Sequence, residues 1–526
     1  MAGLSTDFIL KKEGEESVLD YAIRISDIAS RSIPLEKRKV RAQFFTPKEV
    51  SNFMADMFTI KDKREIRLLD PGAGVGNLTA AFCNKILSSK CKHSIEVDAY
   101  ENDLELVPFL KNVLEMCKKE LEDQGHAMTY VIHKEDFVLH NERHFMNFEN
   151  CGSYDYVISN PPYYKLDKTS SQAVLMRKLI SAHPNIYALF MVLSAKMLKP
   201  EGELVFITPR SFCSGMYYKN FRKWFLQTVR ISHIHTFESR RDIFADEVLQ
   251  ENILIKAVKS DKTQSSVKIT SSKSKIFDTL NEMIVEKDDM FFRKNGYTFI
   301  RIPSSCDDVK ILRLVDAWPN TLNELGLEVS TGPVVVFRTR ENVNYSIERA
   351  EKEVPLIWMH NFHDMEIKWP AIRRNKPNSI YVNEDTKSLL LPVKNYVLLK
   401  RFSSKEQRKR LYASVLLREK FPFETIGIEN HVNYIHKING EMSKEEAVGV
   451  AALLNSRFID NYFRSLNGNT QVNAIEMRSL PLPHISKIVE IGKTVLKTQG
   501  HADLNQITCS VLQIGDMNLI CQGVVK

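Results

Sequence analysis

The chain has 526 residues, a formal net charge of +8, 43% hydrophobic residues and 26% charged residues. This composition is typical of a globular protein with ample core and enough length for two domains. The longest apolar runs stay below the roughly 18 residues that a membrane-spanning helix needs, and the charged start is unlike a signal peptide, so we expect a cytoplasmic protein without a membrane partner. The eight cysteines are scattered without a C-x-x-C pair, which argues against a zinc site and against a disulfide framework.

Positive charge gathers in one segment of the second half of the chain. Residues 394–410 contain seven Lys and Arg side chains against a single acid, with two aromatic residues among them. Such a strip fits the phosphate groups of a polyanion, and it is equally typical of a solvated helix face or loop. Under the first interpretation, Lys400, Arg401 and Arg408 are candidate nucleic-acid contacts.

Two helices are expected before the first strand. Apolar residues repeat at helical spacing from residue 15 to about 31, which predicts an amphipathic packing helix. A second helix is predicted over residues 49–58, with Thr46 suited to the N-cap and Pro47 to the first helical position. A capped start of this kind leaves backbone N–H groups available to an anion.

A glycine-rich run follows the first predicted strand, at residues 66–69. It reads Asp70-Pro71-Gly72-Ala73-Gly74-Val75-Gly76 and leads into a helix. Glycines in this place let the backbone turn tightly and let a ligand lie against the chain. The spacing differs from the G-x-G-x-x-G of dinucleotide enzymes, and it resembles the loop of S-adenosylmethionine-dependent methyltransferases.

Acidic residues follow the next two predicted strands, at residues 96–100 and 130–132. Glu101 stands at the distance where a nucleotide-binding fold places the carboxylate that binds ribose hydroxyls. Asp136, next to Phe137, is a natural acceptor for an adenine amino group. A glycine-rich turn that binds nothing is the alternative, and the alignment of these strand ends at one edge favours a site.

The fourth predicted strand, at residues 156–159, ends in Asn160-Pro161-Pro162-Tyr163. The side-chain carbonyl of Asn160 and the backbone carbonyl of Pro161 are two acceptors that together can bind both hydrogens of an NH₂ group. Tyr163 adds an aromatic face for a planar base or amide. A strand that ends in a Pro-Pro turn with a surface tyrosine is the alternative interpretation of these four residues.

The motifs and their order resemble those of the N6-adenine DNA methyltransferases of bacterial restriction-modification systems, in the gamma arrangement typified by the Taq enzyme. Phe45-Thr46-Pro47 precedes the glycine-rich run, as in the gamma group, and Asn160 to Tyr163 matches the catalytic tetrapeptide. Residues 185–190 and 198–209 are similar to the family's following helix and to its turn and strand. The resemblance extends over the first half of the chain and, more loosely, into the second half, where residues 325–340, 355–358, 396–402 and 453–483 are similar to landmarks of the family's target-recognition domain.

The resemblance implies the roles of individual residues. The implied catalytic residues are Asn160, Pro161, Pro162 and Tyr163. The residues implied to bind S-adenosylmethionine, which would leave as S-adenosylhomocysteine, are Thr46, Pro47, Asp70, Gly72, Gly74, Glu101, Asp136, Phe137 and Asn160. Phe244 matches the position of an aromatic contact to the flipped base, with a core phenylalanine as the alternative and Phe237 as the other candidate. No metal is expected.

The resemblance also implies the architecture and the partners. We expect an α/β fold, with a Rossmann-like methyltransferase domain at residues 41–260 and a mixed α+β target-recognition domain at residues 301–526. Residues 1–40 are expected to form an N-terminal helical extension and residues 261–300 a connecting segment. The expected activity is methylation of N6 of a flipped-out adenine in double-stranded DNA by a monomer. About forty residues precede the first motif, too few for a nuclease domain, so the restriction endonuclease is expected to be a separate chain.

Two other functions remain open at this level. The same tetrapeptide also suits a methyltransferase that acts on an RNA base or on a protein glutamine amide, since both present an NH₂ group. A catalytically silent DNA-binding module is the second alternative. The large domain after the catalytic half favours DNA over RNA or protein, and intact Asn160, Tyr163 and Asp70 argue against a silent module.

Overall fold

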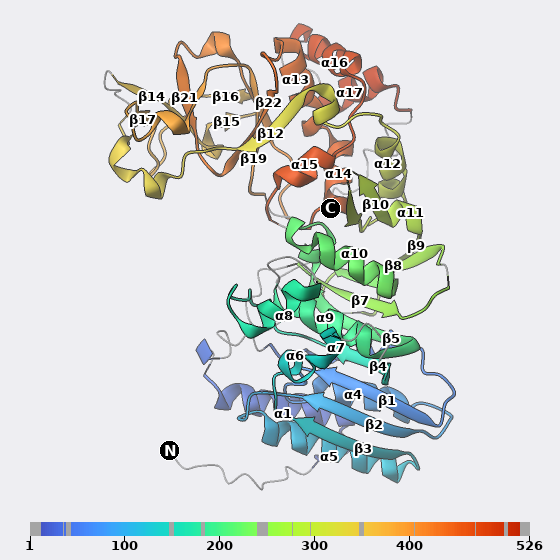
Figure 1. Cartoon of the computed structure of the whole chain (residues 1–526). Helices are drawn as coiled ribbons and strands as arrows, with labels where there is room; N and C mark the ends of the chain where they lie inside the picture. Colours follow the sequence, from blue (N-terminus) through green and yellow to red (C-terminus); the bar gives the residue numbers. More distant parts are fainter. Residues whose placement is uncertain are drawn as a thin grey trace. The chain divides into compact units, whose positions relative to one another are not determined.

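The computed structural model divides the chain into two compact units, Met1–Phe291 and Phe292–Lys526 (Figure 1). The structure describes residues 12–34, 36–37, 44–146, 152–179, 185–238, 251–262, 264–275, 277–294, 296–346, 352–403, 406–468, 470–498 and 503–515. Among these residues, no helix combines the length and the apolar character that crossing a membrane would require.

The first unit is built on a nine-stranded sheet with the order β3-β2-β1-β4-β5-β7-β6-β8-β9. The strands are β1 Glu65–Pro71, β2 Ser94–Tyr100, β3 Ala127–His133, β4 Tyr154–Ser159, β5 Leu198–Pro209, β6 Arg230–Phe237, β7 Asn252–Val258, β8 Ser266–Ser272 and β9 Asn281–Glu286. The first five strands of this order pair in parallel, and β7 pairs antiparallel with both β5 and β6. The expected Rossmann-like α/β sheet is therefore present.

The strand order reverses between β1 and β4, which pair in parallel with Leu68 opposite Tyr156 and Leu69 opposite Val157. Continuing this register places Pro71 level with Ser159, and the Ser159 hydroxyl donates to the Pro71 carbonyl at 2.6 Å. The chain that leaves β1 and the chain that leaves β4 therefore start side by side. In open α/β sheets, this reversal at the carboxyl ends of the strands is where ligands bind.

Helices cover both faces of the sheet (Figure 1). On one face, α1, α3, α4 and α5 contact one another and share one apolar core with the strands. Helix α9, which is apolar almost throughout, contacts β1, β5 and α10. The helices of this unit are α1 Val18–Ser32, α3 Lys48–Asp56, α4 Asn77–Leu87, α5 Val107–Asp123, α6 Phe137–His140, α7 Arg143–Met146, α8 Ser171–Leu179, α9 Ile186–Met197, α10 Lys219–Thr228 and α11 Lys287–Met290.

The start of the chain differs from the expectation in two ways. Helix α1 is capped by Ser17 and packs into the core of the first unit against α4 and α5, so it is part of this unit and not an extension. Helix α3 begins at Lys48, with Pro47 at the N-cap. The prediction that Thr46 is the N-cap is wrong, because its hydroxyl accepts a hydrogen bond from Asn160 instead.

The segment 261–300 also differs from the expected connection. It supplies β8 and β9, and β8 pairs with β6 inside the large sheet. Val267 and Ile269 are buried on one face of β8, and Thr270 and Ser272 are buried on the other, because the side chains of a strand alternate between its two faces. Two of these four buried residues are polar, which conceals the strand in the sequence.

The second unit is mixed α+β, as expected. One sheet has the order β12-β22-β19-β20-β16-β15, a second has the order β13-β17-β14-β21-β18, and β10 pairs with β11. The strands are β10 Phe291–Lys294, β11 Tyr297–Ile300, β12 Leu327–Thr331, β13 Val343–Asn344, β14 Glu353–Ile357, β15 Phe362–His363, β16 Glu366–Ile367, β17 Ser379–Tyr381, β18 Leu390–Pro392, β19 Tyr396–Lys400, β20 Ala413–Leu416, β21 Thr425–Ile428 and β22 Val432–Lys437. The helices are α12 Cys306–Asp316, α13 Lys444–Asn455, α14 Arg457–Leu466, α15 Ala474–Ser479, α16 Ile485–Lys497 and α17 Leu504–Leu512.

Helices α13 and α16 approach each other at two glycines. A Cβ atom on Gly449 would lie 1.9 Å from the carbonyl oxygen of Ile488, and one on Gly492 would lie 1.9 Å from the carbonyl oxygen of Glu445. Both distances are far below van der Waals contact, and the opposing atoms belong to the backbone. The packing of these two helices therefore depends on glycine at both positions.

We expect Gly449→Ala to destabilise the second unit by about 3 kcal/mol, because a methyl group in this contact forces the two helices apart. For a unit of this size, that cost corresponds to a fall of roughly 6–12 °C in its melting temperature. Thermal unfolding of the full chain, followed by circular dichroism, measures the shift. Gly515→Ala is the matched control, since a Cβ atom there has no described neighbour within 4 Å; equal melting temperatures for the two variants would contradict the prediction.

Candidate active site

Hydrogen bonds on three sides define the orientation of the Asn160 amide. Its Nδ2 donates to the carbonyl oxygen of Phe44 at 3.0 Å and to Oγ1 of Thr46 at 3.1 Å. Its Oδ1 accepts from the hydroxyl of Tyr163 at 2.7 Å. Because both N–H groups are engaged on one side, the side-chain oxygen is held on the other side, with one lone pair beyond the bond to Tyr163.

Tyr163 is more buried than the sequence suggests. Its side chain is 9% exposed and its ring meets Tyr187 edge-on at 6.3 Å. Besides Asn160, its hydroxyl lies 3.0 Å from the carbonyl oxygen of Ile207, and burial raises the pKa of the hydroxyl well above its usual range. The alternative of a surface tyrosine is wrong for Tyr163; the next residue, Tyr164, is 39% exposed.

The glycine-rich loop lies at the carboxyl end of β1. Gly72, Gly74 and Gly76 have φ values of 79°, 59° and 96°, which is the left-handed region that favours glycine. The N–H groups of Gly72 and Ala73 donate to the carbonyl of Tyr100 at 3.0 and 2.7 Å. The loop is therefore fastened to the end of β2, next to Glu101.

Glu101 is one of the residues that hold this loop. Its Oε2 accepts from the N–H of Gly74 at 2.9 Å, and its Oε1 accepts from the N–H of Asp103 at 2.7 Å. Burial raises the pKa of Glu101 to about 7, although both hydrogen bonds favour the charged form. Each carboxylate oxygen keeps a further lone pair for a ligand hydroxyl.

Two buried oxygen atoms near the loop have no hydrogen-bond partner among the described residues, Oδ1 of Asp70 and Oδ1 of Asn77. The other side of each group is engaged: Asp70 Oδ2 accepts from the Thr79 hydroxyl at 2.7 Å, and Asn77 Nδ2 donates to the Thr46 carbonyl at 2.9 Å. Burial raises the pKa of Asp70 to about 7. Unsatisfied buried acceptors are costly, so this part of the site suits a ligand that donates hydrogen bonds.

Asp136 and Phe137 lie together at the start of α6. Asp136 Oδ1 caps the helix by accepting from the N–H of Leu139 at 2.9 Å. Phe137 is buried, and its ring lies 5.0 Å from the rings of both Tyr100 and Phe190. The structure assigns Asp136 a capping role that the sequence analysis missed, and its role toward adenine stays a prediction.

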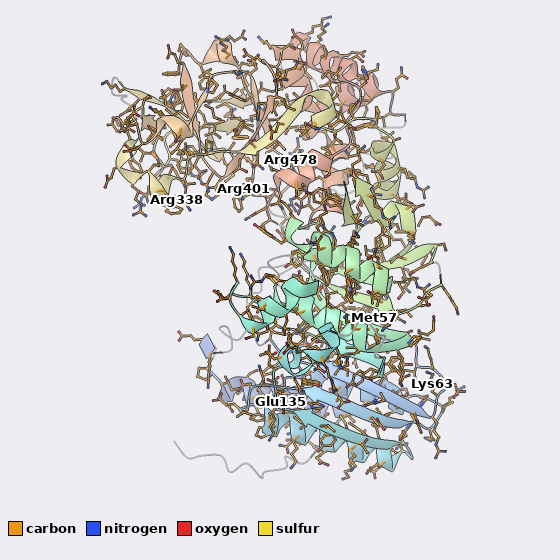
Figure 2. All side chains as sticks on the ribbon, in the orientation of Figure 1. Met57, Lys63, Glu135, Arg338, Arg401 and Arg478 are labelled. Atoms are coloured by element: carbon orange, nitrogen blue, oxygen red, sulfur yellow. The ribbon has the colours of Figure 1, made fainter. Side chains whose placement is uncertain are left out.

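One group of side chains in the described part of the chain has the composition of a metal site. The ligand atoms of His133, Glu135 and His140 lie within 4.8 Å of one another, beside the edge strand β3 (Figure 2). His133 also bonds Oδ1 of Asp98 at 2.8 Å and stacks on Tyr100 at 4.3 Å. These two contacts account for the placement of His133 without an ion, and the group is separate from Asn160 in the fold.

The predicted aromatic contact to a flipped base has two candidates with different outcomes. Phe244 lies outside the described residues. Phe237 ends β6, is 1% exposed and packs against His235 and Phe277. The structure therefore identifies Phe237 as a core residue.

The basic strip at residues 394–410 does not form one exposed face. Arg410 is buried, and Lys409 donates to the carbonyl of Asn455 at 3.0 Å. Lys400 is the only basic residue of the strip that lies in β19, and the other described basic residues of the strip lie outside this strand with different exposures. Arg408 remains exposed.

Lys400 and Arg401 have defined surroundings. Nζ of Lys400 lies 4.8 Å from the ring centre of Tyr412 and 5.6 Å from that of Phe362. Burial and the nearby charge of Arg373 lower the pKa of Lys400. Arg401 donates to the carbonyl of Asn430 at 2.9 Å (Figure 2). The fold thus brings Arg373, which sequence reasoning did not select, next to Lys400.

The sheet order, its reversal at β1 and β4, and the glycine-rich loop define the fold of Rossmann-like S-adenosylmethionine-dependent methyltransferases. A solved structure with this fold is that of the Type IIL restriction-modification enzyme MmeI in complex with DNA. Its TM-score is 0.56 at 11% sequence identity, and the match covers 95% of this chain and 80% of that chain.

Sequence comparison gives the family. The Eco57I restriction-modification methylase family matches residues 26–244. The chain is 36% identical to the Type II methyltransferase M.PstI of Providencia stuartii over 475 residues, 90% of this chain and 92% of that protein. It is also 36% identical to the Type II methyltransferase M.BsuBI of Bacillus subtilis over 480 residues, 88% of this chain and 92% of that protein. The chain therefore belongs to the Type II methyltransferases of restriction-modification systems, which confirms the resemblance seen in the sequence.

We expect the stability of the ligand-free protein to fall as the pH rises from 5 to 7, partly because of Glu101. Its pKa is about 7 in the folded state, where burial raises it from an ordinary value of 4.5. Over this pH range the unfolded chain therefore releases a proton that the folded chain keeps, and unfolding becomes easier. Glu101→Gln should reduce this fall by on the order of 2 kcal/mol. Denaturant unfolding at several pH values measures the slope, with Glu65→Gln, an exposed residue at the start of β1, as the control for the loss of one charge. Parallel pH profiles for wild type and Glu101→Gln would contradict the assignment.

Proposed function

We propose that the chain transfers a methyl group from S-adenosylmethionine to N6 of a flipped-out adenine in duplex DNA. The observation that carries this proposal is the Asn160 amide, whose oxygen is held as an acceptor beside the glycine-rich loop. An acceptor in that orientation suits a substrate that presents N–H groups. The family supports a nucleic-acid substrate, since its members belong to restriction-modification systems.

The residues of the site fit S-adenosylmethionine, which supplies an electrophilic methyl group when bound. The unpaired oxygens of Asp70 and Asn77 suit its ammonium group. Glu101 suits the ribose hydroxyls, and Phe137 with Asp136 suits the adenine. The glycine-rich loop lets such a ligand lie close to the backbone. In this arrangement, each polar part of the cofactor meets a complementary group.

The chemistry required of the protein follows from the properties of the amino group. The lone pair of adenine N6 is delocalised into the ring, and in a duplex the nitrogen is paired, so the base must leave the helix at a cost of a few kcal/mol. Asn160 Oδ1 and the Pro161 carbonyl then accept the two N–H groups and turn the nitrogen lone pair toward the methyl donor. Transfer would place a developing positive charge on N6, which the two carbonyl acceptors stabilise, and the nitrogen would then release one of its two protons. Positioning and hydrogen bonding are the contributions of the chain.

In the second unit, we infer that Lys400, Arg401 and Arg408 contact DNA phosphates, together with Arg373. Lys400 and Arg373 are close enough for their charges to interact, and Arg408 is exposed. Positive charges that lie close together favour the binding of a polyanion such as DNA. We further propose that the protein acts as a monomer and that its methylation protects DNA from a separate restriction endonuclease.

The direct test is transfer of a radiolabelled methyl group from S-adenosylmethionine to DNA, to RNA and to a release factor with a glutamine acceptor, followed by digestion and chromatography. We expect the label in N6-methyladenine from duplex DNA. Label in cytosine, in RNA or in the protein would replace the proposal with another acceptor. Sequencing of methylated bases in a genome that expresses the chain then gives the target sequence.

The same assay tests the site. Asn160→Ala should slow transfer by about 100-fold or more, since it removes an acceptor that acts on the reacting group. Its affinity for S-adenosylmethionine, measured by calorimetry, should stay within a few-fold of wild type. Asn84→Ala, an asparagine of α4 on the same unit, is the control and should leave the rate unchanged. A normal rate in Asn160→Ala would show that the reaction does not use this site.

Lys400→Met keeps the aliphatic stem between the two aromatic rings and removes the charge. We expect weaker DNA binding with a smaller salt dependence, the slope of log K against log salt falling by about 0.9, as for the loss of one phosphate contact. Fluorescence anisotropy over a series of salt concentrations measures this slope. Lys387→Met, which removes a lysine paired with Glu384 in the same unit, is the control. An unchanged slope would exclude a phosphate contact, and altered sequence preference would indicate contact with a base.

A further inference from the structure

Thr46 has contacts that its expected roles as a helix cap and as a cofactor contact do not explain. It is 4% exposed, and its hydroxyl accepts the hydrogen bond from Asn160 Nδ2 at 3.1 Å. Its carbonyl oxygen accepts from Asn77 Nδ2 at 2.9 Å and from the Ser51 hydroxyl at 3.3 Å. Thr46, which precedes the N-cap of α3, is therefore hydrogen-bonded both to Asn160, directly after β4, and to Asn77, the first residue of α4.

The orientation of the Asn160 amide matters because its two ends have almost the same shape and opposite hydrogen-bonding character. With Nδ2 toward Phe44 and Thr46, the oxygen is available to accept from a substrate NH₂ group. If the amide turned over, its own NH₂ would face the NH₂ of the substrate, and neither group could accept. The arrangement around Nδ2 thus decides whether Asn160 binds or repels the acceptor substrate.

The two partners of Nδ2 contribute differently to this choice. The Phe44 carbonyl can only accept a hydrogen bond, so it would repel the Asn160 oxygen if the amide turned over. The Thr46 hydroxyl can accept or donate, so it can bond either end of the amide. Thr46 supplies the second of the two bonds that hold the NH₂ end. Without its hydroxyl, one N–H of Asn160 would be left without this partner inside the protein, and the amide would be held by a single bond on that side.

We propose that Thr46 is a positioning residue for the methyl acceptor: its hydroxyl supplies the second hydrogen bond that holds the Asn160 amide in place, while the Phe44 carbonyl fixes which end of the amide faces the substrate. Segment 44–47, assigned from the sequence to the cofactor side of the site, then acts on the acceptor side as well. This inference rests on the proposed function, since it assumes that Asn160 Oδ1 binds the amino group that is methylated. It adds a residue 114 positions away in sequence to the acceptor site.

The contact to Asn77 places Thr46 between the two halves of the site. Asn77 Nδ2 donates to the Thr46 carbonyl, and the buried Oδ1 of Asn77 has no hydrogen-bond partner among the described residues, in the region that suits the cofactor. A change in the Thr46 hydroxyl leaves this carbonyl contact available, because the two contacts use different atoms. The two roles of segment 44–47 can therefore be separated by substitutions at a single side chain.

Thr46→Val and Thr46→Ser form the matched pair for the test. Valine keeps the shape and removes the hydroxyl, and serine keeps the hydroxyl. For Thr46→Val, we expect the single-turnover rate of methyl transfer to duplex DNA to fall about tenfold, the effect of one lost hydrogen bond at 1.36 kcal/mol per decade. Calorimetric affinity for S-adenosylmethionine should stay within about twofold to threefold, and Thr46→Ser should recover most of the rate.

Three results would overturn the proposal. The first is a wild-type rate of methyl transfer in Thr46→Val. The second is a Thr46→Ser variant that is as slow as Thr46→Val although its melting temperature equals that of wild type. The third is a Thr46→Val variant that loses only affinity for S-adenosylmethionine. The melting temperature identifies a variant that fails for structural reasons, and the serine variant keeps the test valid if valine perturbs the fold.

Asn160→Ala separates this proposal from the proposed function. If Thr46 acts through Asn160, adding Thr46→Val to Asn160→Ala should cause no further loss of rate, because residues that act as a unit are not additive. A further tenfold loss in the double variant would show that Thr46 acts elsewhere. If Asn160→Ala itself transfers methyl groups normally, the proposed site fails; if Asn160→Ala is inactive and Thr46→Val is normal, only the positioning role fails.

Discussion

The parallel pairing of β1 with β4 is the constraint on which the rest of the site depends. The register Leu68 to Tyr156 brings the two strand ends level, and the bond from Ser159 to the Pro71 carbonyl holds them together. A slip of one residue in this pairing would reverse the faces of every side chain on one strand, and Asn160 would leave the glycine-rich loop. The packed faces of the sheet forbid such a slip, so the position of Asn160 is set by the apolar core and not by the site itself.

The polar groups at this edge are arranged for a ligand more than for stability. Asp70 and Glu101 are buried carboxyl groups whose pKa values burial raises to about 7, and Asp70 and Asn77 each keep a buried oxygen without a described partner. Each feature is unfavourable in the ligand-free chain. A ligand that binds only the folded state shifts the folding equilibrium toward that state. The groups that lower the stability of the ligand-free protein therefore raise the stability of the protein with its ligand bound.

The sequence predicts those features that are local. Strands β1 to β4, the glycine-rich loop and the positions of Glu101, Asp136 and Asn160 follow from short patterns, because each pattern contains both the strand and the turn after it. The role of Thr46 could not be predicted in the same way, since its partner is 114 residues away and only the fold joins them. Strand β8 was missed because its apolar residues are few, and the burial of Arg410 within the basic strip could not be predicted because it depends on tertiary packing.

The Asn160 site indicates which functional group the substrate presents, but not which molecule carries that group. Asn160 Oδ1 has one lone pair beyond the bond from Tyr163, and in the proposed reaction the Pro161 carbonyl would be the second acceptor for the two hydrogens of one NH₂ group. Adenine N6 and a glutamine amide both satisfy that count, so the site geometry alone does not separate them. The separation comes from the rest of the chain: a second unit with two sheets, and relatives that match 36% of residues over about nine-tenths of the chain and belong to restriction-modification systems. In the proposed function, methyl transfer belongs to the first unit and contacts with DNA to the second.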